Sequence, residues 1–192
     1  MADELDLPAL HGDALAHTQR IVDGIADDAW GLPTPCEDWD VREVLNHVVA
    51  GNWWAARLAA GETIAEVGDE LDGDMLGDDP RAAYRASVEP AATVFERPGA
   101  MDAPAAVSYG PVPGSVYAGH RFLDVLIHGW DLAVGSGQDT TLPPDLVEAC
   151  RRVVEPQLDM LAGSGMFGDG ARPDHVEPGQ DALLKVLGRS PA

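Results

Sequence analysis

The sequence predicts an all-α protein, an antiparallel helical bundle with additional short helices and loops. Apolar residues recur at three- and four-residue spacing through several segments that are long enough to form helices. Segments rich in proline and glycine separate them, and the alternation of apolar and polar residues that marks a half-buried strand is nearly absent. The 192 residues are 45% hydrophobic, which suits one sizeable core, so we expect a single domain over residues 1–192.

The first helix is expected over residues 8–24, where a proline suits the first turn and apolar residues fall at helical spacing. Two prolines and a glycine exclude a regular helix at residues 30–36, so a loop follows. The second helix begins after Asp40 and runs toward Gly61. Its start is marked by Asp40 and Glu43, which form an Asp-x-x-Glu variant of the capping box.

Residues 62–79 are rich in acidic residues and glycine, which predicts either a mobile acidic connection or a short frayed helix. An Asp-Pro pair then starts a third long helix over about residues 80–96, with a kink at Pro90. The prolines and glycines of residues 101–114 predict a loop, and a short extended pair around residues 106–109 is the alternative.

The fourth long helix is expected over about residues 115–134, where a Gly-Ser-Gly sequence ends it. A fifth helix covers about residues 143–161 and bends at Pro156. A tail rich in glycine, proline and aspartate follows at residues 163–179. The chain then forms a last amphipathic turn or two over residues 182–187.

The charge of the chain argues against two classes of partner. Twelve basic and 33 acidic residues give a formal net charge of −21, so nucleic acid and anionic membrane surfaces are not expected to bind. The amino terminus lacks the pattern of a secretory signal, and no apolar run approaches the length of a membrane span. We therefore expect a cytoplasmic protein.

Cys36 and Cys150 lie far apart in the sequence and cannot form a dense disulfide framework. We interpret each as a buried small hydrophobic residue rather than a reactive thiol. A nucleophilic pair of Cys36 with a histidine is disfavoured, because the proline-flanked loop supplies no visible base. The motifs of serine hydrolases, phosphate-binding loops and dinucleotide sites are not found either.

The most informative segment is the helix expected over residues 115–134. At about 100° per residue, five polar side chains fall within an arc of about 80° on its surface, and the rest of that surface is mostly apolar. They are Tyr117, His120, Asp124, His128 and Asp131. A stripe of histidine and carboxylate that faces the interior must be paired, protonated or bound to a cation, because an isolated buried charge is costly. A metal ion is the simplest common partner.

Asp124 and His128 lie one helical turn apart, and carboxylate and neutral imidazole are ligands for divalent transition ions. His47, at the border of the inward face of the second helix, is the candidate for the third ligand. Three protein ligands leave a position open for water or substrate, which is typical of catalytic or ligand-binding sites. We expect His120 and Asp131 to orient the ligands through hydrogen bonds.

The alternative is a plain helical bundle whose polar stripe forms a hydrogen-bonded core or a dimer interface. His120 and His128 would then be hydrogen-bonded core residues, and Asp124 would pair with Arg121 or another arginine. The other histidines lie in segments with no comparable setting, and we assign them to the surface: His11, His17 and His175.

Three motifs occur in order along most of the chain: Trp30-x-x-Pro33-Thr-Pro-Cys36-x-x-Trp39-x-Val41-x-x-x-Leu45-x-His47, Asp124-Val-Leu-Ile-His128-Gly-Trp-Asp-Leu132 and Leu183-Leu-x-x-Leu187-Gly-Arg189. Together they resemble the DinB-like metal-binding proteins, and more narrowly the branch related to the metal-binding domain of mycothiol-dependent maleylpyruvate isomerase. The resemblance implies a DinB-like four-helix bundle that holds a divalent metal, commonly zinc. It places His47, Asp124 and His128 at the positions of the family's ligands.

The resemblance also implies a function. A low-molecular-weight thiol such as mycothiol would bind the open metal position as a thiolate and serve thiol-dependent transfer or isomerisation of a small-molecule substrate. Zinc is the expected ion, and Ni²⁺ or another transition ion is the alternative. A second hypothesis is a metal-binding protein without catalysis, such as a stress-response module with a structural ion. We expect a monomer or a homodimer.

Two departures from the isomerase shape these expectations. The isomerase has an additional carboxy-terminal domain that we do not expect in this chain, so maleylpyruvate itself is not the expected substrate. The isomerase also has a glutamate where this chain has Asp124. The shorter side chain would move the ion or bring His120 into its coordination.

Overall fold

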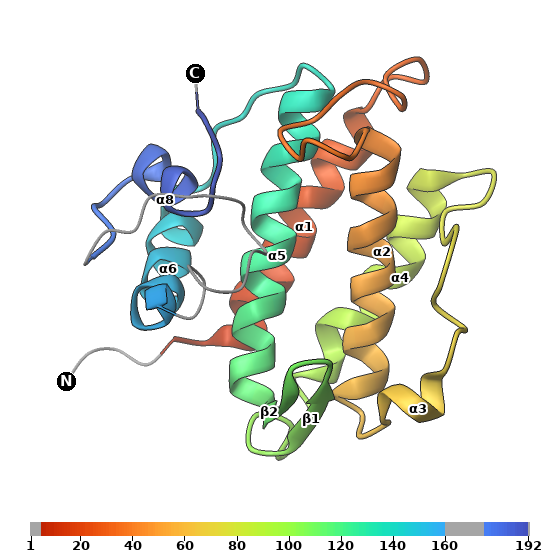
Figure 1. Cartoon of the computed structure of the whole chain (residues 1–192), viewed down its shortest axis with the longest axis vertical. Helices are drawn as coiled ribbons and strands as arrows, with labels where there is room; N and C mark the ends of the chain where they lie inside the picture. The colour runs from red at the N-terminus through yellow and green to blue at the C-terminus, as the bar shows by residue number, and fades with distance from the viewer. Residues whose placement is uncertain (1–4, 160–174, 192) are drawn as a thin grey trace. The chain divides into compact units, whose positions relative to one another are not determined.

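The computed structural model describes residues 5–159 and 175–191. This described part is mostly helical and contains one two-stranded sheet, which confirms the predicted all-α class. The chain divides into two compact units, Met1–Asp139 and Thr140–Ala192. Figure 1 shows both units.

Four long helices form the first unit: α1 (Leu7–Gly24), α2 (Val41–Leu58), α4 (Pro80–Val94) and α5 (Gly114–Gly135). Helix α5 packs against α1 and α2, and α4 packs against the same two helices, so the four helices close into a bundle (Figure 1). The four-helix core expected from the family resemblance is therefore present, and it places α2 and α5 side by side.

Helix α5 approaches α1 closely at Gly129. A Cβ atom at this position would lie 2.4 Å from the Thr18 hydroxyl oxygen, so a side chain here would require Thr18 or its helix to move. The Thr18 hydroxyl donates a hydrogen bond of 3.1 Å to the Val125 carbonyl of α5. This contact fixes the inner face of α5 in the bundle.

Helix α2 begins with the capping box that the sequence predicts. The Asp40 carboxylate accepts the Glu43 amide at 2.9 Å, and the Glu43 carboxylate accepts the Asp40 amide at 2.9 Å. Each bond satisfies an amide that would otherwise have no partner in the first turn. The helix ends at Leu58, somewhat before the predicted Gly61.

Replacing Asp40 with alanine removes the acceptor for the Glu43 amide. We expect the free energy of unfolding to fall by about 1 kcal/mol, as is usual for the loss of an N-cap. Urea denaturation followed by circular dichroism measures this loss. Asp40→Asn is the control, because asparagine caps helices about as well as aspartate; equal destabilisation by both variants would contradict the capping role.

The connection at residues 62–79 contains the short helix α3 (Ile64–Val67), which has its own Thr63–Glu66 capping box. Two hydrogen bonds tie this connection to α2: the Asn46 side-chain amide donates to the Gly73 carbonyl at 2.9 Å, and the Met75 backbone amide donates to the Asn46 side-chain oxygen at 2.7 Å. Of the two predicted alternatives, the structure thus contains the short helix, in a connection that is bonded to the bundle.

The extended pair is longer than the predicted residues 106–109. Strand β1 (Pro104–Val107) pairs antiparallel with β2 (Gly110–Pro113), and the hairpin leads directly into α5. Ala105 and Val107 of β1 are buried. Two prolines in β2 and one in β1 sit in a two-stranded hairpin, where unpaired edges tolerate them.

The second unit contains α6 (Pro144–Val154), a 3₁₀ turn η1 (Glu155–Gln157) and α8 (Gln180–Val186). The turn η1 lies at the bend predicted for Pro156. The expected end of the fifth helix, residues 160–161, and most of the predicted tail at residues 163–179 lie outside the described residues. Throughout the described ranges, every helix is too short or too polar to span a lipid bilayer.

Candidate metal centre

The three predicted ligands meet between α2 and α5. His47 projects from α2, and Asp124 and His128 project from successive turns of α5. The Asp124 Oδ1 atom lies 3.2 Å from His47 Nε2 and 3.5 Å from His128 Nε2. One donor atom from each of the three residues lies within 4.8 Å of the others. The bundle thus brings together residues that are 77 positions apart in sequence.

The donor set fits a divalent ion. Tetrahedral sites with metal–nitrogen and metal–oxygen bonds of about 2.0–2.2 Å separate neighbouring donors by about 3.3–3.5 Å. The two distances from Asp124 Oδ1, 3.2 and 3.5 Å, lie close to that value. Two imidazoles and one carboxylate are also the ligand types of open zinc sites. The residues present therefore suit zinc or a similar ion.

A chain of hydrogen bonds holds the other oxygen of Asp124. Arg121 Nη1 donates to Asp124 Oδ2 at 2.8 Å, and Arg121 Nη2 donates to the Asn52 side-chain oxygen at 3.2 Å. The Asn52 amide donates to the Ser87 hydroxyl at 3.0 Å, which donates to the Tyr84 carbonyl at 2.8 Å. The pairing with Arg121 that the sequence offered as an alternative is thus present, and it leaves Oδ1 facing the histidines.

Gly51 makes room for this arginine. A Cβ atom at Gly51 would lie 2.4 Å from Arg121 Nη1 and 2.7 Å from its Cζ. Only glycine allows the guanidinium to lie directly against the backbone of α2. The position of Asp124 is therefore set by α2 and α4 as well as by its own helix.

The charges around Asp124 favour its ionised form. Burial by itself raises the pKa of a carboxyl group, but Arg121, His47 and His128 outweigh that effect and hold the pKa of Asp124 well below its usual range. Asp124 is thus an anion at neutral pH, as a metal ligand must be.

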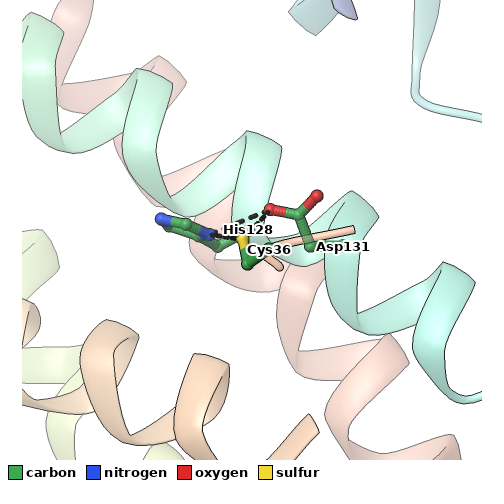
Figure 2. Close-up of side chains that lie close together, drawn as sticks. All are labelled: Cys36, His128 and Asp131. Atoms are coloured by element: carbon green, nitrogen blue, oxygen red, sulfur yellow. Dashed lines mark hydrogen bonds and ion pairs between the residues drawn. The ribbon is translucent and has the colours of Figure 1, made fainter. Parts of the chain in front are cut away.

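Asp131 holds the far side of the His128 ring. Its Oδ2 atom lies 3.0 Å from His128 Nδ1, and its side chain is fully buried (Figure 2). A carboxylate at this distance favours the proton on Nδ1, which directs the lone pair of Nε2 toward Asp124 and His47. This is the geometry that the predicted orienting role of Asp131 requires.

Cys36 lies beside the Asp131 carboxylate. The sequence did not reveal this contact. Its Sγ atom is 3.2 Å from Asp131 Oδ2 and 3.8 Å from His128 Nδ1 (Figure 2). The Cys36 amide donates to the Thr34 hydroxyl at 3.1 Å, and that hydroxyl donates to the Trp39 carbonyl at 2.7 Å, so the loop is ordered. The interpretation of Cys36 as a buried hydrophobic residue is wrong, because α5 supplies polar partners from 92 and 95 positions away.

Trp39, from the same loop, covers the histidines. Its ring centre lies 4.9 Å from that of His47 and 6.0 Å from that of His128. The loop that carries Cys36 and Trp39 therefore contributes two side chains to the site, in addition to the three from the helices.

Comparison with known proteins decides the family. Residues 11–133 match the sequence family described as the mycothiol maleylpyruvate isomerase N-terminal domain. The chain belongs to this family. The match spans nearly all of the bundle that carries His47, Asp124 and His128, and it confirms the resemblance found in the sequence.

Two relatives of this chain are the uncharacterized proteins MT0763 and Rv0738 of Mycobacterium tuberculosis. Each is 35% identical over 190 residues, which cover 93% of this chain and 98% of the relative. The similarity thus extends beyond the family's N-terminal domain into the second unit.

Two crystal structures share the fold. The mycothiol-dependent maleylpyruvate isomerase superposes with a TM-score of 0.63 over 95% of this chain and 86% of its own. A histidine-to-alanine mutant of that isomerase superposes with a TM-score of 0.65 over 86% of this chain and 72% of its own. The superpositions establish the DinB-like fold. Because sequence identity is 18% in both cases, they establish the fold alone.

The remaining members of the polar stripe lie elsewhere on α5. The His120 Nδ1 atom is 2.6 Å from the Tyr109 hydroxyl in the hairpin. Among the described residues, two clusters of side chains could hold a metal ion, and His120 belongs to neither. Its orienting role stays a prediction. Tyr117 packs edge-on against Phe95, and burial raises its pKa to about 12, so this residue belongs to the core.

The surface assignment of the other histidines needs correction. His11 is fully buried and packs edge-on against Phe95 at 5.4 Å, because its face of α1 points into the bundle. Burial, with the charge of Arg121 adding to it, lowers the pKa of His11 to about 3. His17 is half-buried, with Nδ1 3.2 Å from an Arg20 nitrogen. Only His175 is exposed as expected.

Cys150 is a buried residue, as the sequence predicts. It is fully buried in α6, and burial raises the pKa of its thiol.

Proposed function

We propose that this protein is a metal-dependent enzyme of thiol transfer or isomerisation, with a divalent ion on His47, Asp124 and His128. Zinc is the first choice of ion. A low-molecular-weight thiol of the mycothiol type is the proposed co-substrate, and a small electrophile is the second substrate. The observation that carries the proposal is the meeting of these three donors at distances close to those of tetrahedral coordination, within a bundle of the mycothiol isomerase family.

The ion, when bound, would lower the pKa of a coordinated thiol and so present a thiolate nucleophile at neutral pH. The protein residues prepare its ligands. Asp131 holds the Nδ1 proton of His128 and keeps Nε2 free for the ion. Arg121 binds one oxygen of Asp124 and leaves the other for the ion. The three ligands leave one position open in a four-coordinate site, as a co-substrate requires.

Trp39 limits the approach to this open position. Its ring lies against His47 and His128 and is itself 37% exposed, so it forms an apolar wall between the ligands and solvent. A thiol with an apolar or sugar-like body would stack on such a wall better than a small hydrophilic ion would.

The test compares metal content and turnover in three forms of the full chain. We expect wild-type protein, purified without chelator, to hold about one ion per chain by elemental analysis. His47→Ala removes one of three ligands, so its zinc affinity should fall by more than the roughly 10–100-fold that loss of an outer partner costs. His17→Ala is the matched control, since it removes a half-buried histidine of α1, and it should retain the ion.

Zinc-loaded wild type should then consume a low-molecular-weight thiol with a model electrophile, and His47→Ala should not. Zinc retention together with full turnover by His47→Ala would overturn the assigned site. A structural ion would give a different result. The wild type would then show no thiol transfer, and His47→Ala would lose both the ion and much of its stability.

A further inference from the structure

His128 presents its two ring nitrogens to two different donor sets. Nε2 faces Asp124 at 3.5 Å and the ring of His47. Nδ1 faces Asp131 Oδ2 at 3.0 Å and Cys36 Sγ at 3.8 Å. Figure 2 shows this second side, where the thiol reaches the gap between the imidazole and the carboxylate. One ring thus links two clusters of metal-ligating side chains.

The second cluster has the composition and spacing of a metal site. Cys36 Sγ, His128 Nδ1 and Asp131 Oδ2 all lie within 4.8 Å of one another. A tetrahedral ion with a metal–sulfur bond of about 2.3 Å and a metal–nitrogen bond of about 2.0 Å separates sulfur from nitrogen by about 3.5 Å. The observed 3.8 Å between Sγ and Nδ1, and 3.2 Å between Sγ and Oδ2, require only small adjustments.

Charge and burial also favour a cation in this cluster. Asp131 is fully buried and the His128 residue is 7% exposed, so charges here interact strongly. A thiolate and a carboxylate together neutralise a divalent ion, and the neutral imidazole adds a third bond. Cys36 is only partly buried, so the cluster is not sealed from solvent.

We propose that Cys36, Nδ1 of His128 and Asp131 form a second seat for a thiophilic divalent ion, alternative to the seat at His47 and Asp124. Binding replaces the Cys36 thiol proton, which leaves to solvent, and moves the ring proton of His128 from Nδ1 to Nε2. The two seats exclude each other, because a neutral imidazole has one lone pair to offer. The choice depends on the ion: cadmium and other soft ions favour the thiolate, whereas harder ions favour nitrogen and oxygen donors.

The inference shares His128 with the proposed function but is tested separately. The probe is Cd²⁺ titrated into metal-free full-length protein under reducing conditions, followed by the ultraviolet thiolate-to-cadmium charge-transfer band. We expect a band in the wild type that saturates at about one Cd²⁺ per chain. His47→Ala should keep the band, because it removes only a ligand of the first seat. Cys150→Ala should keep it as well, since Cys150 is fully buried in the other unit.

Cys36→Ala should abolish the band, and Cys36→Ser provides a second variant of nearly native size whose hydroxyl gives no such band. Circular dichroism checks that both variants are folded. The proposal is overturned if the wild type shows no band, or if the band persists in a folded Cys36 variant. In either case the three residues form only a hydrogen-bonded cluster. Zinc retention is compared in Cys36→Ser and in Cys36→Ser with His47→Ala, where the thiolate of the second seat is absent and only the first seat is tested, so failure of one assignment is distinguishable from failure of the other.

Discussion

Arg121→Met is expected to lower the free energy of unfolding of the metal-free protein by about 3 kcal/mol. Removing one partner of a buried ion pair costs about 3–5 kcal/mol, because the remaining charge loses its compensation. The lower end applies here, since the Asp124 side chain is still 20% exposed. The substitution also leaves the Asn52 oxygen without the donor that it has in the wild type. Urea denaturation in the presence of a chelator measures the loss.

Arg85→Met is the matched control. It makes the same side-chain change on α4, where Arg85 pairs with Asp23 at 2.7 Å, but both side chains are nearly half exposed. Exposed pairs of this kind contribute at most about 1 kcal/mol. If the two methionine variants lost equal stability, the buried network around Asp124 would have no special importance.

Gly51→Ala tests the same network without removing a polar group. Alanine in a helix interior is normally about 1 kcal/mol more favourable than glycine. Here its methyl group would displace the Arg121 guanidinium, 2.4 Å away, and with it Asp124. The network therefore predicts weaker zinc binding and no gain in stability, whereas helix preference alone predicts a gain in stability and unchanged zinc binding.

The second large effect is the acid sensitivity that His11 gives to the protein. The unfolded chain takes up a proton at His11 below about pH 6.5, whereas the folded pKa of about 3 keeps the buried ring neutral. The unfolded state thus binds more protons between these two values, so stability falls as the pH drops. Between pH 7 and 4.5, this one group should lower the free energy of unfolding by about 2.5 kcal/mol.

His11→Phe keeps an aromatic ring against Phe95 and cannot be protonated. We expect the difference in unfolding free energy between pH 7 and 4.5 to shrink by about 2.5 kcal/mol relative to the wild type. His11→Leu should show the same change in pH dependence, whatever either variant costs at pH 7. If the unfolding free energy of His11→Phe changed with pH as much as that of the wild type, His11 would not be a neutral buried ring in the folded protein.

Features with a short-range cause were predicted well from the sequence. The Asp40–Glu43 capping box depends on residues three positions apart, and the stripe of Asp124, His128 and Asp131 follows from the helical period alone. The pairing of His47 with that stripe was predictable from chemistry and family resemblance together. These signals determined the helical class and the candidate ligand set.

His11 shows where such reasoning ends. Its helix has polar residues on several faces, and nothing local distinguishes a histidine that meets Phe95, at the end of α4, from one that meets solvent. The hairpin was only an alternative for a similar reason, because its proline-rich strands have no alternation that would mark a buried face.

The sequence by itself determined which residues of α5 share a face and that this face needs a partner, because periodicity and charge are local properties. Only the tertiary structure decided which residues contact this face. Arg121 binds one oxygen of Asp124 because Gly51 of α2 leaves space for it. Cys36 meets Asp131 because a loop 95 residues away folds over the end of the stripe. Such contacts depend on how helices and loops pack in space, and helical spacing carries no information about that packing.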